Sequence, residues 1–218
     1  MFQPDIFKER SVPAMHALVR AHPFATLVTT LDGRPEVDHV PLVLHPEGGK
    51  CGVLRGHLAR GNPLARSEGT KPEASEPEAL AVFQGPQTYV SPSWYASKRE
   101  HGKVVPTWNY ACVHARGTLR LVRDGEWLMQ HLRDLSAQHE AHRTQPWAVE
   151  DAPADFVTRM LRGLVGFEIA IGSLEGTWKV SQNKNRADRT GVVDGLRESD
   201  NTAAVAMSRL VGERQPPL

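Results

Sequence analysis

The sequence predicts an α+β protein built on an antiparallel β-barrel. Roughly six or seven short segments are rich in β-branched residues, and the first of them are separated by turn residues rather than by helices. Helical periodicity is concentrated in the C-terminal half. This order favours a meander of antiparallel strands over alternating βαβ units. The 218 residues fit one compact domain, or one domain with a small appendage.

The N-terminal part predicts one helix followed by a β-meander. Apolar residues recur at helical spacing after Ser11, a good N-cap residue, and His22-Pro23 ends the helix. The pair Asp32-Gly33 is typical of a tight hairpin, and the run Pro46–Gly49 makes the next turn. The strands expected here cover residues 24–30, 36–44 and 50–55.

The later strands alternate with helices towards the C-terminus. Pro92 marks a sheet edge or strand end, and Gly117 predicts a bulge. Asp124 opens a helix whose inner face holds Trp127 and His131. The expected strands cover residues 79–84, 87–95, 108–122 and 165–171, and residues 176–180 continue the last of them. The expected helices cover residues 124–139 and 154–163, with further helical segments from residue 185.

The most informative stretch runs from Val53 to Pro63. An apolar strand leads into Gly56 and His57, and a polar, cationic turn follows. Asn62 suits the cap position, and Pro63 suits the first position, of the helical segment that comes next. Arginines and backbone N–H groups at the end of a strand can bind a phosphate group.

Two later segments, Pro106–Tyr110 and Trp178–Lys184, are rich in aromatic and polar side chains. Aromatic rings supply faces for a planar ligand, and amides and hydroxyls supply hydrogen bonds to its edge. Together with the cationic turn, these segments suggest a site for a flat, phosphorylated cofactor.

Composition excludes several classes of protein. The formal net charge is +1, with 26 basic and 25 acidic residues, so no global field attracts nucleic acid. No run approaches the ~18 apolar residues of a membrane helix, and the polar N-terminus does not resemble a signal peptide. We therefore expect a soluble, cytoplasmic protein. Cys51 and Cys112 lie in apolar runs and are expected to be buried free thiols, although spacing alone does not exclude a disulfide.

Motifs for other chemistries are missing or incomplete. The sequence has no GxGxxG or Walker A pattern, no G-x-S-x-G elbow and no zinc-ligand spacing. Three histidines, His131, His139 and His142, lie on or after one helix, and only the last two share i, i+3 spacing. A solvated helix face explains these histidines, and we expect no metal site.

Six segments, in this order along the chain, resemble the PaiB-type FMN-binding negative transcriptional regulators. That family is a branch of the split-barrel flavin-binding superfamily, which includes pyridoxamine 5'-phosphate oxidases. The segments are Met1–Pro4, His39–Leu42, Gly56–Pro63, Tyr89–Tyr95, Val105–Tyr110 and Lys179–Lys184, the last with Val180 where we expect leucine.

The resemblance implies a fold, an assembly and a cofactor. It implies a six-stranded antiparallel split β-barrel with peripheral helices, a homodimer, and FMN in clefts at the dimer interface. Residues 1–184 would form the split-barrel FMN-binding domain, and residues 185–218 a C-terminal helical extension packed on the barrel or on the dimer partner.

FMN needs cations or N–H donors for its phosphate, and an aromatic or apolar face with polar edges for its ring. Arg60 is the best phosphate ligand because arginine can bind bidentately, and Arg55, Lys179 and Lys184 come next. His57 suits the phosphate, the flavin edge or a backbone carbonyl. The candidate cofactor-binding residues are Arg55, His57, Arg60, Asn62, Ser91, Trp94, Tyr95, Thr107, Trp108, Asn109, Lys179, Ser181, Gln182 and Asn183.

Several of these residues have a structural alternative. Arg55 and Arg60 can be solvated turn residues that bind no phosphate. Trp108 can be a core or dimer-interface aromatic, and Ser181–Asn183 can cap a turn.

The resemblance implies a transcriptional regulator, but local charge does not support direct DNA contact. Residues 185–218 carry five basic and five acidic residues, and the last expected helix has only Arg209 to meet a phosphate. Two alternatives stay open. One is a flavin-dependent oxidoreductase, such as a flavin reductase or a pyridoxamine-phosphate-oxidase-like enzyme; the other is a non-catalytic flavin- or haem-binding module. No catalytic residue is assigned.

Overall fold

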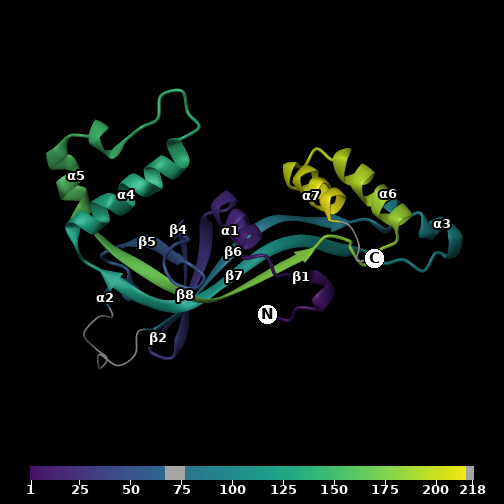
Figure 1. Cartoon of the computed structure of the whole chain (residues 1–218), viewed down its shortest axis with the longest axis horizontal. Coiled ribbons are helices and arrows are strands. Elements are labelled where there is room, and N and C mark those ends of the chain that lie inside the picture. The colour runs from purple at the N-terminus through teal and green to yellow at the C-terminus, as the bar shows by residue number, and fades with distance from the viewer. Residues whose placement is uncertain (67–76, 215–218) are drawn as a thin grey trace. The chain divides into compact units, whose positions relative to one another are not determined.

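A computed structural model describes residues 1–66 and 77–214 of the chain. The described residues form an α+β fold around one eight-stranded sheet, in the order β3-β2-β6-β7-β8-β5-β4, with β1 paired to β8 (Figure 1). No pairing between the end strands β3 and β4 closes the sheet in the described residues. The α+β class and the antiparallel sheet are confirmed.

The strands differ greatly in length. Six of them have seven or more residues, whereas β1 and β4 have two and three, so the predicted count of six is not confirmed. The strands are β1 Lys8–Glu9, β2 Phe24–Leu31, β3 Arg34–Pro41, β4 Val43–His45, β5 Val53–Ala59, β6 Glu78–Val90, β7 Thr107–Val122 and β8 Leu164–Lys179.

The helices lie between the strands or after them. The α-helices are α1 Val12–Ala21, α2 Pro63–Arg66, α3 Ser97–His101, α4 Gly125–Glu140, α5 Ala154–Leu161, α6 Arg186–Arg197 and α7 Thr202–Glu213. Of these, α4 and α5 correspond to the helices predicted at 124–139 and 154–163. The 3-10 helices are η1 Asp5–Phe7, η2 Pro92–Trp94 and η3 Val149–Asp151. No described helix has the length and apolar character needed to cross a membrane.

The chain divides into two compact units. We call Met1–Leu18, Gln84–Val113 and Glu175–Leu218 the terminal unit, and Val19–Phe83 with His114–Leu174 the central unit. Helices α6 and α7 belong to the terminal unit and lie side by side in it (Figure 1). The division predicted at residue 184 stays a prediction, and residues 215–218 of that extension lie outside the described residues.

Local turn and cap signals fold as the sequence predicts. Asp32 and Gly33 have φ values of 49° and 77°, the positive pair that a type I′ hairpin needs between β2 and β3. The Ser11 hydroxyl accepts a hydrogen bond from the Ala14 N–H at 3.3 Å at the start of α1. The Asp124 carboxylate accepts one from the Trp127 N–H at 2.7 Å at the start of α4.

Strand β5 corrects the expected strand at residues 50–55. It begins at Val53 and continues to Ala59, and its last residue pairs with Leu164 of β8. Gly56 is therefore a strand residue and not the start of a turn. A Cβ atom there would lie 2.4 Å from the Phe167 ring, so the glycine makes close packing between β5 and β8 possible.

One interruption predicted from the sequence does not occur, because β6 is continuous through Gly85 and Pro86. Strand β8 runs without a break from Leu164 to Lys179, in agreement with the prediction that residues 176–180 continue the strand at 165–171. Conversely, the strand expected at 36–44 is split at Leu42 into β3 and β4. Pairing with neighbouring strands outweighs the local turn propensity of glycine and proline in β6.

Neither cysteine forms a disulfide bond among the described residues. Cys112 is buried, as expected, whereas Cys51 is only half-buried and corrects the expectation for that residue.

Helix α6 packs closely against η2. A Cβ atom at Gly191 would lie 2.0 Å from the Trp94 carbonyl oxygen, and one at Gly195 would lie 2.4 Å from the Trp94 indole ring. The two glycines are spaced i, i+4 and share one face of the helix. They let the backbone and ring of Trp94 rest directly on α6.

We expect Gly191→Ala to lower the free energy of unfolding by about 1–3 kcal/mol, the scale of overpacking, despite the better helix propensity of alanine. Denaturant titration measures the change. Gly212→Ala in α7 is the matched control, because no atom lies within 4 Å of its added Cβ. Equal midpoints for the Gly191 variant, the control and the wild type would contradict the contact.

Candidate functional site

The predicted cofactor-binding residues fall into two groups. Four of them, Arg55, His57, Arg60 and Asn62, belong to the central unit. The other ten belong to the terminal unit; they are Ser91, Trp94, Tyr95, Thr107, Trp108, Asn109, Lys179, Ser181, Gln182 and Asn183. We describe each group within its own unit.

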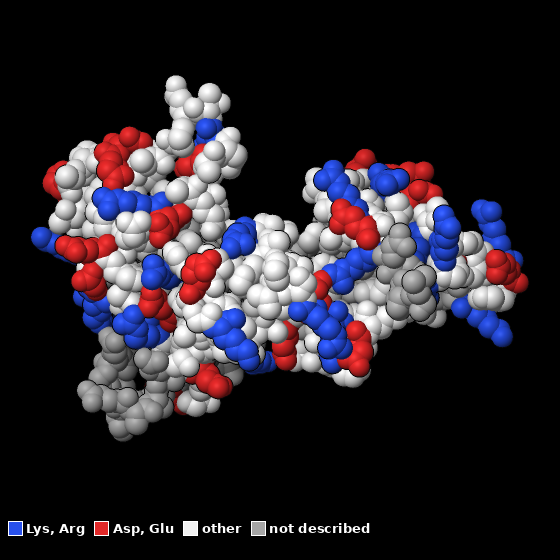
Figure 2. Space-filling model, viewed as in Figure 1, with Lys and Arg blue, Asp and Glu red and all other residues white. Residues whose placement is uncertain are grey.

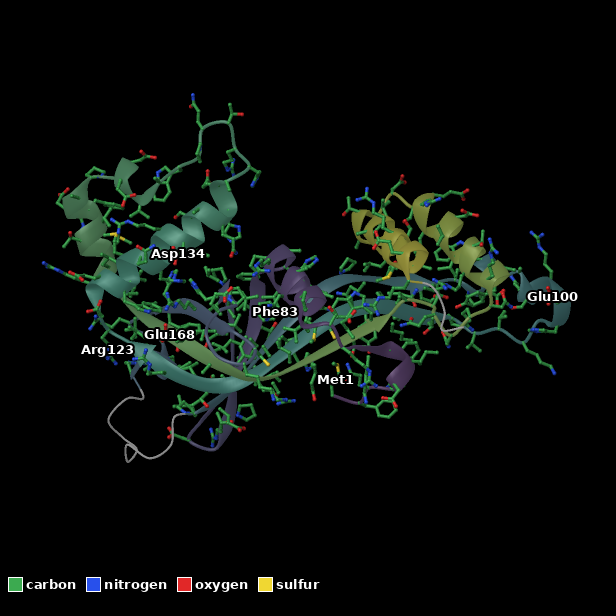
Figure 3. All side chains as sticks on the ribbon, in the orientation of Figure 1. Met1, Phe83, Glu100, Arg123, Asp134 and Glu168 are labelled. Carbon is green, nitrogen blue, oxygen red and sulfur yellow. The ribbon has the colours of Figure 1, made fainter. Side chains whose placement is uncertain are left out.

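Arg55 is engaged with an acidic residue of the neighbouring strand. Its Nε donates to Glu168 Oε1 at 2.9 Å, and its guanidinium lies 5.5 Å from the centroid of the Trp127 ring. Arg120 Nη2 and Trp127 Nε1 also donate to Glu168, at 2.6 and 3.2 Å. Figure 3 labels Glu168 in the central unit. Arg55 therefore forms a structural ion pair with Glu168.

The same contacts set the charge of Glu168. Burial by itself would raise the pKa of this carboxyl group. The hydrogen bonds from Arg120 and Trp127 and the charge of Arg55 outweigh burial, and the pKa lies below its ordinary value. Glu168 is therefore ionised at neutral pH and balances the arginines.

His57 forms a pair with His131 of α4. His57 Nδ1 and His131 Nε2 are 3.1 Å apart, and the Trp127 ring stacks on His131 with centroids 5.4 Å apart. His131 is only 1% exposed, which confirms its predicted place on the inner face of the helix and corrects its interpretation as part of a solvated face. Among the described residues, no group of three or more His, Cys, Asp or Glu side chains fits a metal ion.

Burial favours the neutral form of both imidazoles. It lowers the pKa of His57, and burial together with the neighbouring His57 lowers the pKa of His131 to about 4. Asp134, labelled in Figure 3, opposes this shift and lies 3.8 Å from His45 Nε2. At neutral pH the pair is an uncharged hydrogen bond that joins β5 to α4.

Arg60 is exposed in the turn that follows β5. Its backbone N–H donates to the Gly163 carbonyl at 2.7 Å, and no ion pair of its guanidinium occurs within residues 1–66 and 77–214. Asn62 caps α2 as predicted, because its Oδ1 accepts from the Leu64 N–H at 2.8 Å. Its Nδ2 donates to Asp38 Oδ1 at 2.7 Å. Of the central group, Arg60 keeps a cation available to a ligand.

Lys179 and Lys184 form a cationic pair in the terminal unit. Lys179 Nζ donates to Thr107 Oγ1 at 2.6 Å, and Lys184 Nζ lies 4.6 Å from the centroid of the Tyr95 ring. Burial, and next the positive charge of Lys184, lower the pKa of Lys179. Neither lysine has a carboxylate ion pair among the described residues. Such a pair attracts an anion.

A buried polar contact lies in the same unit. Asn109 Nδ2 donates to Ser181 Oγ at 2.9 Å, while Asn109 Oδ1 is buried without a hydrogen-bond partner among the described residues. Ser181 has a positive φ of 62°, so the segment after β8 turns sharply at this residue.

Trp108 and Tyr89 form an exposed aromatic pair. Their ring centroids are 6.5 Å apart with an interplanar angle of 74°, and the side chains are 55% and 46% exposed. Trp108 and its neighbours in β7, Thr107 and Asn109, point to opposite faces because side chains alternate along a strand. Sequence reasoning missed Tyr89 as a site residue. The alternation of β6 could have found it, since Tyr89 lies between the buried residues Thr88 and Val90.

The remaining predicted residues support the local backbone. Ser91 Oγ accepts from the Ser93 N–H at 3.2 Å and caps η2. Gln182 Oε1 accepts from the Val180 N–H at 2.7 Å, and Gln182 Nε2 donates to the Ile6 carbonyl at 3.1 Å. Trp94 rests on α6, Tyr95 is buried and Asn183 is exposed. Direct contact of these residues with a cofactor stays a prediction.

Comparison with known proteins identifies the family. Residues 1–173 match the family described as "Putative FMN-binding domain". The protease synthase and sporulation protein PAI 2 of Bacillus subtilis (strain 168) is 33% identical over 214 residues, covering 98% of each chain. The chain belongs to the PaiB-type FMN-binding family. The resemblance predicted from the sequence is confirmed, and FMN is the cofactor of this PaiB-type protein.

Solved structures share the fold of this chain. The PaiB-type chain is similar to the FAD and heme binding protein from Mycobacterium smegmatis, with a TM-score of 0.53, 16% identity, and coverage of 79% of this chain and 73% of that one. It is also similar to a conserved hypothetical protein from Mycobacterium tuberculosis, with a TM-score of 0.57, 14% identity, and coverage of 85% and 95%. At these identities the likeness is one of fold alone.

The residues of the PaiB-type chain fit FMN in their chemistry. A phosphate needs cations without carboxylate partners, which Arg60, Lys179 and Lys184 provide among the described residues. The ring needs an aromatic face, and Trp108 with Tyr89 offers an exposed one.

The histidine pair predicts a loss of stability in acid. Both folded pKa values lie below the unfolded value of 6.5, so protons bind the unfolded chain more tightly. The stabilisation is complete above pH 6.5 and is lost as the pH falls towards 4, by on the order of 2–3 kcal/mol for His131. Denaturant titrations between pH 7 and 4.5 measure this slope.

His131→Gln tests the assignment, with the exposed His142→Gln as its matched control. In the control variant the free energy of unfolding should fall with pH as steeply as in the wild type. In the His131 variant it should fall much less steeply. An unchanged slope in His131→Gln would show that other groups cause the acid dependence.

Proposed function

We propose that this protein is a homodimeric, PaiB-type FMN-binding regulator in which FMN lies at the dimer interface. The observation that carries the proposal is the cationic pair Lys179 and Lys184, which has no carboxylate partner among the described residues. Among the predicted phosphate ligands, Arg60 is the third cation with the same property. Arg55, by contrast, is held by Glu168 and is no longer favoured as a phosphate ligand.

The phosphate of FMN carries nearly two negative charges and would be held by Arg60 with Lys179. Arginine supplies two parallel N–H donors to a phosphate, and lysine supplies a compact charge. Thr107 orients Lys179 through its hydroxyl group. The other polar residues of the group, Asn109 and Ser181, are bonded to each other, and the unpartnered Asn109 Oδ1 can accept a hydrogen bond.

The flavin ring would rest against an aromatic face such as Trp108 with Tyr89, which leaves redox chemistry to the cofactor itself. An exposed apolar patch of this kind also suits a protein interface. Val105 belongs to the same unit and is 69% exposed. The family resemblance implies a cofactor at a dimer interface, where a second copy would contribute residues to each site.

Regulation by this protein would be indirect. The PaiB-type relative carries a name that refers to protease synthase and sporulation, which is consistent with a regulatory role. Residues 185–218 have balanced charge, with five basic and five acidic residues, so they give little electrostatic attraction to DNA. We infer that FMN chemistry, a small metabolite or a partner protein mediates the effect. Turnover of a reduced nicotinamide or of a pyridoxal-type substrate would instead favour the oxidoreductase.

Removal of one phosphate ligand should separate FMN from riboflavin. We expect Arg60→Ala and Lys179→Met each to weaken FMN binding by about 1.5–3 kcal/mol, the scale of a charged hydrogen bond. Riboflavin binding should barely change, because riboflavin lacks the phosphate. Quenching of flavin fluorescence measures both affinities. Arg34→Ala, an exposed arginine of the β2–β3 hairpin, is the control, and equal losses for the two flavins would exclude a phosphate contact.

A mixed dimer tests which subunit supplies each ligand. We expect a purified heterodimer of one Arg60→Ala subunit and one Lys179→Met subunit to keep one wild-type FMN site. If the two residues serve the same site from different subunits, both substitutions fall in one site and leave the other intact. Titration should then give one tight site per dimer. Two weakened sites would place both residues of a site in one subunit, and a monomer in sedimentation that binds FMN tightly would remove the interface.

A further inference from the structure

Helices α6 and α7 line an open pocket in the terminal unit. Its volume is about 460 Å³, within the range of small-molecule sites. The basic residues that line it are Arg186, Arg189 and Arg197, and the apolar ones include Val193 and Val211. All the lining residues lie beyond residue 173, where the match to the FMN-binding family ends.

The charge of the lining is positive. Asp194 is the one acidic residue among the lining residues, against three arginines. Arg186, Arg197 and Asp194 form no ion pair within residues 1–66 and 77–214. The arginines share one face of α6 at i, i+3 and i+11, so they are distributed along a groove of ~16 Å. Figure 2 shows both basic and acidic side chains on the part of the surface that carries α6 and α7.

Arg189 is a buried cation without an acidic partner among the described residues. Its side chain is only 8% exposed. Arg189 Nη2 donates to the Val211 carbonyl at 2.5 Å and to the Arg214 carbonyl, so it holds the end of α7. Its Nε is buried with no hydrogen-bond partner in the described residues. Burying a guanidinium without a counter-charge is unfavourable, and an anion in the adjoining pocket relieves that cost.

We propose that the pocket between α6 and α7 binds a small organic anion that has one carboxylate or phosphate group on a short apolar chain. The charged group meets the guanidinium groups of Arg189 and Arg186. The apolar chain lies on Val193 and Val211. Asp194 disfavours a second negative group beside it on the same helix face, which favours a ligand with a single anionic group.

Isothermal titration at constant ionic strength tests the proposal on the full-length protein. Hexyl phosphate and hexanoate are the two arms that distinguish a phosphate from a carboxylate, and hexylammonium is the cationic control. We expect saturable binding of at least one anion and none of hexylammonium. FMN-saturated protein should bind the anion with the same affinity, because no lining residue belongs to the predicted FMN group.

Substitutions locate the bound anion. Arg186→Gln with Arg197→Gln should weaken binding by roughly three- to tenfold, the range for partly exposed charged contacts. Arg209→Gln is the matched control, because it removes the same charge from an exposed position of α7 outside the pocket lining. Arg189 is left unchanged because it holds the end of α7.

Four outcomes would overturn the proposal. They are no saturation by either anion up to about 10 mM, equal binding of hexylammonium, equal affinity of the double variant and the wild type, and competition by FMN. The last outcome would make the pocket part of the flavin site. The FMN titrations of the Arg60 variant are read separately, so failure of one proposal leaves the other intact.

Discussion

Direct contact between the Trp127 ring and the backbone of β8 organises the central unit. A Cβ atom at Gly166 would lie 2.2 Å from this ring, so only glycine lets the indole come so close. From that position the indole donates to Glu168 and stacks on His131. Glu168 in turn neutralises Arg55. One close approach thus packs α4 on the sheet, covers His131 and brings the ring that donates to Glu168 beside the half-buried Arg55.

This constraint decides which cations remain for a cofactor. The sequence places two arginines close together, and both are plausible ligands of a phosphate. In the folded chain Arg55 lies under α4 with its charge balanced, whereas Arg60 is one residue past the end of β5 and exposed. Lys179 remains available to a phosphate for a different reason. It is the last residue of β8, and the positive charge of Lys184, after burial, lowers its pKa. Position relative to strand ends therefore separates structural cations from available ones.

Features that depend on neighbours in sequence could be predicted, and features that depend on distant partners could not. The Asp32-Gly33 hairpin, the Asn62 cap and the Asp124 cap each need only a few adjacent residues. The ion pair of Arg55 joins residues 113 positions apart, and the histidine pair joins residues 74 apart. No local pattern encodes those separations. The extension of β5 to Ala59 was not predicted for the same reason, because the pairing of β5 with β8 outweighs the turn propensity of Gly56.

Helix α6 has two faces with different tasks. Gly191 and Gly195 lie on the face that supports Trp94, and Arg186, Val193 and Arg197 lie on the face that lines the pocket. Residues at these spacings are on roughly opposite sides of an α-helix. Trp94 belongs to the Tyr89–Tyr95 segment that the family resemblance assigns to the flavin site. One short helix therefore touches both the anion pocket and that segment. Shared contact is not coupling by itself, because coupling needs two arrangements of α6 with different affinities. Trp94 lies directly against the helix at both glycines, so α6 has little room to move without changing its contact with Trp94. A shift of α6 caused by an anion would therefore first change the position of Trp94.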